Sequence, residues 1–366
     1  MLAFDNLAKQ APTRVSTLSG PKGFLQTDLN QALRQAARVG GYAWWYIEMQ
    51  DDNRQFGLTL ILFAGSVFSP NYARALRLGQ PICGLQVPAV NLVVCERHHT
   101  RWKQTLWVMS EYTERALLAT DRSICVADTS LVLNPDGSLS VRLSERQTLF
   151  WGRPGRAVEL ALHLSPPGPL LPPQPLGQDD QGNSHFWQPW SLLSRASATL
   201  RQGATQVAFA GTAYCDHNFG GGRLENCFSR WGWAHACMAD GELGAVVYDT
   251  LLKSGVRQGL AVRQKGRQSV PVVEQAAVPD AGDRDRGRGF FWLKVPWAIS
   301  VGTLVAWRQK NSRRLDAPFY ARFAATVRDE TQWPGLALDG VGEYLELNRL
   351  LPLLPLLPYK TYCGGR

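Results

Sequence analysis

The chain has 366 residues, of which 45% are hydrophobic and 19% charged, and its formal net charge is +9 at pH 7. This composition is typical of a globular protein and excludes an intrinsically disordered chain. A net positive charge is compatible with binding to nucleic acid, with binding to an anionic lipid surface, or with no particular partner. Because no dense run of Lys and Arg is interleaved with aromatic residues, nucleic acid is not expected as a partner.

Residues 1–39 are predicted to form a polar N-terminal extension with one short helix. The stretch 28–39 (DLNQALRQAARV) carries apolar residues at helical spacing and is followed by Gly. From residue 41 the pattern becomes that of short β-strands separated by turns such as Asn134-Pro135-Asp136-Gly137. The expected strands lie in YAWWYIEMQ, FGLTLILFAGSVFS, VNLVVCER, KQTLWVMSE, ICVADTSLVLN, LSVRLSERQTLFWG and AVELALHLS. Short strands without helices between them predict an antiparallel sandwich or barrel over residues 40–190.

A proline-rich linker, SPPGPLLPPQPLGQDDQGN (165–183), is included at the end of this first β domain, because its proline content is incompatible with a central strand. Strand patterns then resume, and we predict a second β domain over residues 191–366 that ends in the hydrophobic segment LLPLLPLLPY (350–359). The chain contains 13 Trp residues, several at alternate positions of predicted strands. They indicate either a lumen lined with aromatic rings or a large aromatic core.

The cysteines and the N-terminus indicate a cytoplasmic protein. The seven cysteines are odd in number and no two are spaced CxxC, so neither a disulfide framework nor a metal site is expected. The first residues, MLAFDNLAKQAPTR, lack the apolar core of a signal peptide. No apolar run approaches the roughly 18 residues that a membrane-spanning helix needs.

The strand AFAGTAYCDHNFGGG (208–222) ends in Asp, His and Asn, which are poor strand formers. Residues i and i+2 of a strand share a face. His185 therefore shares a face with Trp187, and Tyr214 shares a face with Asp216. If the two strands are neighbours, the four side chains converge and form a candidate catalytic site; taken singly, each would be an ordinary core or turn residue.

Six further residues are weaker candidates for substrate binding. They comprise two polar neighbours of Asp216, a pair of Trp residues on one strand face, and a Tyr-Asp pair that offers a second acid. Core packing is the ordinary alternative for the aromatic residues, and a turn or cap for the polar ones. The six are His217, Asn218, Trp231, Trp233, Tyr248 and Asp249.

Several long stretches resemble the carotenoid 1,2-hydratases of carotenoid-making bacteria, which are also called hydroxyneurosporene synthases. The resemblance is carried by GGYAWWYIEMQDDNRQFGLTLILFAGSVFSPNYARA, AVNLVVCERHHTRWKQTLWVMSE, SHFWQPW, GTAYCDHNFGGGRLENCFSRWGWAHA, DAPFYARFAATV and GVGEYLELNRL. It implies an all-β fold of two tandem lipocalin-like antiparallel β-barrels. It also implies a hydro-lyase without a cofactor that adds water across the terminal C1–C2 double bond of an acyclic carotenoid such as neurosporene or lycopene. The family's proposed His-x-Trp and Tyr-x-Asp site corresponds to His185, Trp187, Tyr214 and Asp216.

Hydration of an alkene requires a proton donor that can generate a carbocation. Burial in an apolar lumen raises the pKa of an Asp above its ordinary value of about 3.9, so Asp216 could act as the general acid. We expect Trp187 to stabilise the cation, Tyr214 to orient or share the acid, and His185 to hold the attacking water. On the sequence alone the acid and base roles of His185 and Asp216 are interchangeable.

The expected partners are therefore a carotenoid, water and the anionic surface of an inner or photosynthetic membrane, into which 350–359 would dip unless it packs across a barrel mouth. Two other functions fit the same scaffold. A pericyclase would fold a polyene into rings and would depend on cavity shape more than on an acid. A carrier would bind carotenoid or lipid and release it unchanged.

Overall fold

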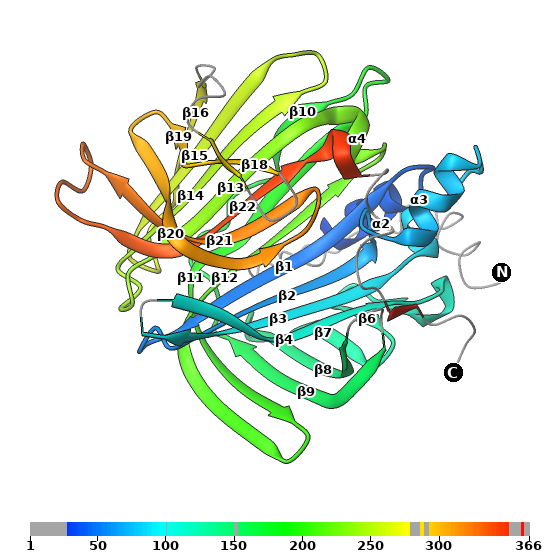
Figure 1. Cartoon of the computed structure of the whole chain (residues 1–366), viewed down its shortest axis with the longest axis horizontal. Helices are drawn as coiled ribbons and strands as arrows, with labels where there is room; N and C mark the ends of the chain where they lie inside the picture. The colour runs from blue at the N-terminus through cyan, green and yellow to red at the C-terminus, as the bar shows by residue number, and fades with distance from the viewer. Residues whose placement is uncertain are drawn as a thin grey trace.

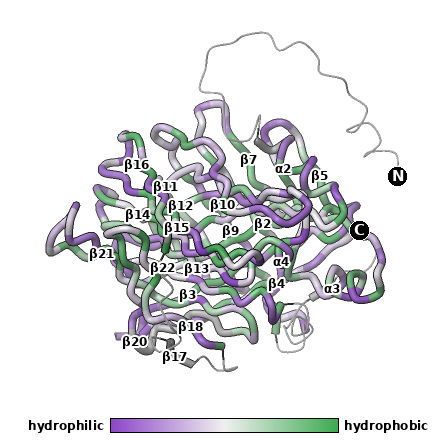
Figure 2. Tube along the Cα trace, turned by 90° about the horizontal axis from the view of Figure 1, so that it is seen from above, coloured by the Kyte–Doolittle hydropathy of each residue, from purple (hydrophilic) through white to green (hydrophobic). Residues whose placement is uncertain are grey.

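The structure is a computed structural model that describes residues 28–99, 101–149, 153–278, 286–288, 293–350 and 360–361. Within this part of the chain, strands dominate and form two large antiparallel sheets, which confirms the predicted all-β class (Figure 1). Figure 2 shows hydrophobic and hydrophilic residues interspersed along the strands. In the strand Leu139–Thr148 buried and more exposed residues largely alternate, the period-two pattern from which the strands were predicted. The short helix expected within residues 28–39 is present as α2 (Asp28–Ala36).

The elements of the first half are α2 (Asp28–Ala36), β1 (Tyr42–Asp51), β2 (Phe56–Gly65), α3 (Pro70–Arg77), η1 (Gly84–Gln86), β3 (Ala89–His98), β4 (Arg101–Glu111), η2 (Glu114–Ala116), β5 (Leu117–Ala119), β6 (Ser123–Val126), β7 (Thr129–Leu133), β8 (Leu139–Thr148), β9 (Pro154–Leu164), β10 (Gln174–Gln178), β11 (Ser184–Gln202) and β12 (Thr205–Gly220). Those of the second half are α4 (Leu224–Cys227), β13 (Phe228–Cys237), β14 (Leu243–Leu252), β15 (Arg257–Lys265), β16 (Val272–Ala277), β17 (Arg286–Arg288), β18 (Lys294–Pro296), β19 (Ala298–Val301), β20 (Leu304–Asp316), β21 (Tyr320–Asp329), β22 (Leu338–Glu346), η5 (Leu347–Arg349) and β23 (Lys360–Thr361).

The first sheet has the strand order β23-β4-β3-β2-β1-β12-β11-β9-β8-β7-β6-β5, with β10 paired to β11. It curls until β4 meets β8, where Ser110 donates a hydrogen bond to Glu145 and the hydroxyl of Thr148 accepts one from the backbone N–H of Met109. The second sheet has the order β16-β15-β14-β13-β22-β21-β20-β19, and β17 pairs with β18 separately. The two sheets lie against each other, with β1, β11 and β12 of the first sheet facing the second (Figure 1).

Strand β1 is buried on both faces because it separates two apolar cores. Alternate residues of the strand belong to different cores, as the pleat requires. Ala43, Trp45, Ile47 and Met49 pack inside the first sheet, and Tyr42, Trp44 and Tyr46 pack between the sheets. Strand β12 pairs with β1 in antiparallel register and divides its side chains in the same way. Strands β1 and β12 thus form a wall with one core on each face, called here the two-faced wall, and Asp216 on β12 points to the face between the sheets.

The predicted boundary at residue 190 falls inside β11. Both β11 and β12 are hydrogen-bonded into the first sheet, through β9 and β1 respectively. The division of the chain into domains therefore stays a prediction, although the hydrogen-bonded sheets themselves separate after β12. The proline-rich linker contains β10, a short strand off the main path of the sheet.

The hydrophobic segment 350–359 lies, apart from Leu350, outside the described residues. Among the helices that the structure describes, none is both long enough and apolar enough to cross a membrane. The six cysteines within the described residues carry free thiols.

Candidate active site

A cavity between the two sheets has a wall made largely of aromatic rings. The Trp-rich strands left open a lumen lined with aromatic rings or a large aromatic core; the structure has features of both, because the rings that line this cavity also belong to the core between the sheets. The cavity is also lined by two carboxyl groups of the described residues, those of Asp216 and Glu343. The aromatic lining residues are Trp44, Tyr46, Phe63, Phe68, Trp107, Trp231, Trp233, Tyr248, Phe319 and Tyr320.

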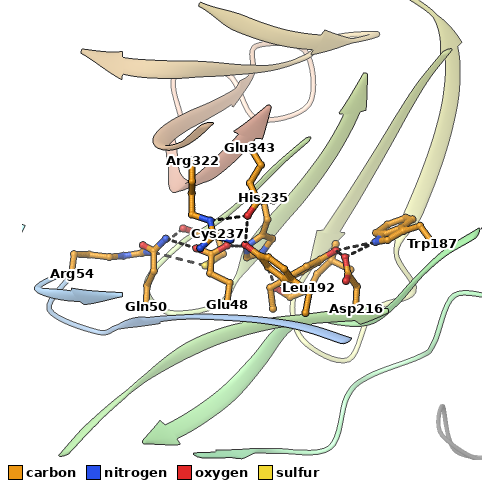
Figure 3. Close-up of polar contacts among 12 residues, drawn as sticks. Glu48, Gln50, Arg54, Trp187, Leu192, Asp216, His235, Cys237, Arg322 and Glu343 are labelled. Carbon is orange, nitrogen blue, oxygen red and sulfur yellow. Dashed lines mark hydrogen bonds and ion pairs between the residues drawn. The ribbon is translucent and has the colours of Figure 1, made fainter. Parts of the chain in front are cut away.

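The structure brings together the two predicted pairs, because β11 and β12 are hydrogen-bonded neighbours with Trp187 opposite Asn218. The indole Nε1 of Trp187 donates to Oδ2 of Asp216 at 2.7 Å and lies 3.0 Å from the hydroxyl of Tyr214. The hydroxyl of Tyr214 donates to the same carboxylate oxygen. Figure 3 shows Trp187 directed at Asp216. Three of the four predicted catalytic residues thus form one hydrogen-bonded group.

The carboxyl group of Asp216 is 2% exposed, and its pKa is raised to about 7. Burial is the largest cause, since it disfavours the charged form; the hydrogen bonds from Tyr214 and Trp187 oppose it, and the negative charge of Glu343 adds to it. A substantial fraction of Asp216 is therefore protonated at neutral pH. Because Oδ2 already accepts two hydrogen bonds, the proton belongs on Oδ1, which accepts one from Asn218 at 3.1 Å.

His185 joins the site through Asn218. Since the amide nitrogen of Asn218 donates to Asp216, its oxygen accepts from Nε2 of His185, 3.3 Å away. Nδ1 of His185 then accepts from the hydroxyl of Tyr42 at 2.6 Å. Burial lowers the pKa of His185 to about 3, so the ring is neutral. Both ring nitrogens are occupied and the side chain does not line the cavity, so its geometry is that of a group that orients Asn218.

The six weaker candidates divide into two groups. Asn218, Trp231, Trp233 and Tyr248 line the cavity, a position that allows the predicted contact with a substrate. His217 and Asp249 do not.

His217 lies on the opposite face of β12, where its ring stacks between Trp45 and Phe219 in the core of the first sheet. Asp249 instead forms an ion pair with Arg257, with distances of 2.6 and 2.5 Å.

Sequence reasoning missed a second polar group on the cavity wall, formed by Tyr46, Arg322 and Glu343. Oε1 of Glu343 accepts from Nε of Arg322 at 2.8 Å and from the hydroxyl of Tyr46 at 3.0 Å. The guanidinium carbon of Arg322 lies 5.6 Å from the ring centroid of Tyr320. The sequence did carry a signal for this group. Arg322 in FYARFAATV and Glu343 in GVGEYLEL are each charged residues flanked by apolar residues of a strand.

A buried polar chain supports the ring of Tyr214 from behind. Tyr214 stacks on His235 with 4.5 Å between ring centroids, and Nδ1 of His235 lies 3.4 Å from a carboxylate oxygen of Glu48. Gln50 donates to Glu48 at 2.9 Å and accepts from Arg54 near the β1–β2 turn (Figure 3). These contacts restrict Tyr214 and through it the orientation of Asp216.

No group of three or more His, Cys, Asp or Glu residues suited to a metal ion occurs in the part of the chain that the structure describes. What the site offers chemically is a carboxylic acid near half-protonation, a second carboxylate paired with Arg, and aromatic faces. This combination suits proton transfer to an apolar, electron-rich substrate.

Comparison with known proteins gives a consistent result. A family model described as "Carotenoid hydratase CrtC" matches residues 60–360. The chain is 29% identical over 327 residues to the acyclic carotenoid 1,2-hydratase of Thiocapsa roseopersicina. The matched region covers 88% of this chain and 73% of that protein. It is 31% identical over 223 residues to the protein of the same name from Rubrivivax gelatinosus. Here the matched region covers 60% of this chain and 50% of that protein.

Among solved structures, a protein from Nitrosomonas europaea described as "a putative AttH" superposes with a TM-score of 0.57 at 15% identity. The match covers 84% of this chain and 92% of that one. It shows a common fold, which confirms the prediction of tandem lipocalin-like antiparallel β-barrels.

Proposed function

The chain belongs to the carotenoid hydratase CrtC family, and on that premise we propose that it adds water across the terminal C1–C2 double bond of an acyclic carotenoid such as neurosporene or lycopene. It is a hydro-lyase that acts on carotenoids; the choice of carotenoid, the bond and the mechanism are the proposal. The observation that carries it is a carboxyl group with a pKa of about 7 on the wall of an aromatic cavity.

The reaction begins when Asp216 transfers the proton on Oδ1 to C2 of the polyene end. The positive charge then lies at C1, where it is tertiary and therefore most stable. The faces of Trp231 and Trp233 line the cavity, and each aromatic face stabilises a nearby cation by ~0.5–2 kcal/mol. These two residues suit that role better than Trp187, which does not line the cavity and whose N–H is directed at Asp216. Water attacks C1 and yields the tertiary alcohol.

The proposal is tested by incubating the purified full chain with lycopene or neurosporene in liposomes and measuring product mass. A product heavier by one molecule of water is expected. A rearranged product of unchanged mass would indicate a pericyclase instead, and bound polyene recovered unchanged would indicate a carrier. The cytoplasmic location and the contact with an anionic membrane stay predictions.

The rate of hydration is expected to depend on pH through Asp216. Because the protonated carboxyl group is the reactive form, the rate of the chemical step should be maximal well below pH 7 and should fall as the pH rises through about 7, approaching tenfold per unit beyond it. Single-turnover rates with saturating polyene, measured between about pH 5 and about pH 9, check this. A rate that is constant up to about pH 9 would contradict the role of Asp216 as the acid.

A further inference from the structure

We propose that Glu343, held by Arg322 and Tyr46, binds the attacking water and accepts its proton. This inference rests on the proposed function, because it assigns the second half of a reaction whose first half belongs to Asp216. Hydration needs both halves: once the cation exists, a water molecule must be held beside C1 and must lose a proton as the C–O bond forms.

Glu343 is on the cavity wall and keeps acceptor capacity for a water. Its side chain lies on β22 and that of Arg322 on β21, and both point toward β1 (Figure 3). The hydrogen bonds from Arg322 and Tyr46 both reach Oε1, at 2.8 and 3.0 Å. Oε2 therefore retains lone pairs for a further donor. The residue is 8% exposed, so a water bound there would be isolated from bulk solvent.

Arg322 supplies the complementary donor. It lines the cavity, is 1% exposed, and its Nη1 has no hydrogen-bond partner among the described residues. A buried guanidinium N–H without a partner is costly, and a water that accepts from it removes that cost. In the proposed arrangement one water accepts from Arg322 and donates to Oε2 of Glu343, beside the hydroxyl of Tyr320, which also has no hydrogen-bond partner among the described residues. An oxygen lone pair of this water is then directed toward the cavity.

His185, the residue first expected to hold the water, lacks these features. Both of its ring nitrogens are engaged, by Tyr42 and Asn218, and its ring is enclosed by Phe228 and Trp231 away from the wall. Asp216 and Glu343 are the carboxyl groups among the described residues that line the cavity. They offer one proton donor and one proton acceptor in the same space.

The steps balance as follows. The π electrons of the double bond take the proton of Asp216 to form the C2–H bond, and C1 becomes a cation. A lone pair of the water forms the C1–O bond, and the resulting protonated alcohol, a strong acid, transfers a proton to Glu343. When the product leaves, water in the cavity returns that proton from Glu343 to Asp216. One water is consumed and both carboxyl groups regain their initial states.

The two carboxyl groups are coupled electrostatically, which fits this sequence of events. The negative charge of Glu343 helps to keep the proton on Asp216 before the reaction. After the reaction Asp216 is negative and Glu343 is neutral. Both carboxylates are negative only while the positive charge of the carbocation, and then of the protonated alcohol, is also in the cavity and offsets their repulsion.

The test is a double variant, Arg322→Gln with Glu343→Gln, which removes both charges and so avoids leaving one buried charge alone. Kinetics with lycopene should show a loss in kcat of more than about 100-fold. Binding of the polyene, followed by quenching of tryptophan fluorescence, should remain within a few-fold of the wild type. A matched control is Arg263→Gln with Asp329→Asn, a second buried pair (2.6 Å) that does not line the cavity, and it should keep its kcat.

A folded double variant with wild-type kcat would overturn the inference, and so would one that loses binding and activity together, because the pair would then only shape the cavity. If the double variant does not fold, Glu343→Asp keeps the charge while withdrawing the carboxylate by one methylene; it should lower kcat with binding retained, and an unchanged kcat would overturn the inference. Wild-type protein that makes no alcohol would refute the proposed function itself, a result distinct from all of these.

Discussion

Replacement of Asp216 by Asn is expected to abolish hydration while the fold and the binding of polyene persist. Asn is nearly the same size and keeps an oxygen that can accept from Trp187 and Tyr214, but it has no transferable proton. General acids contribute about 10²–10⁴-fold to rate, and the upper end applies here because the alkene offers no other site for activation. Product mass and polyene binding, measured in parallel with the wild type, check the result.

The same variant has an unusual consequence for stability. The pKa of Asp216 is raised from 3.8 to about 7, so the folded state binds more protons than the unfolded state between these values. The contribution of Asp216 to the free energy of unfolding is fully present below pH 3.8 and is lost as the pH rises through about 7. At about 1.36 kcal/mol per unit, the cost of holding the ionised group reaches roughly 4 kcal/mol.

Asp216→Asn should therefore be more stable than the wild type at about pH 8.5, with a smaller difference at about pH 5. Urea unfolding at both pH values measures this. Retained hydration by the variant would refute the assignment of the acid, and equal stability at alkaline pH would show that ionised Asp216 is solvated in the folded protein.

Replacement of Arg322 alone, by Met, is expected to destabilise the protein severely. Met fills a similar volume but leaves the carboxylate of Glu343 buried without its counter-charge. Breaking a buried pair in this way typically costs about 3–5 kcal/mol. The free energy of unfolding from urea titration gives the magnitude, and the double variant described above should lose much less. If Arg322→Met lost under about 1 kcal/mol, Glu343 would have to be protonated or solvated in the variant.

The pair of strands that carries the predicted catalytic residues was predictable because strand geometry is local. Alternation alone puts His185 with Trp187 and Tyr214 with Asp216, and the resemblance to a known family selected these four among many similar residues. The same rule, applied consistently, would also have removed His217, since it is adjacent to Asp216 and must point to the other face.

The second polar group was not predictable in this way. Tyr46 and Glu343 are hydrogen-bonded across 297 residues of sequence, and only the packing of one sheet on the other brings them together. The sheet to which the site strands belong was not predictable from sequence order for a related reason. β11 and β12 follow the linker in sequence but complete the first sheet, because their backbone groups pair with β9 and β1.

The two-faced wall formed by β1 and β12 sets a limit on how the protein can respond to heat. The residue beside Asp216 on the chain packs in one core while Asp216 faces another, and no loop lies between them. A site carried on loops can melt before its scaffold does. Here Asp216 keeps its alignment as long as the central strands stay paired, so we expect heat to disturb the acid only when that sheet itself comes apart.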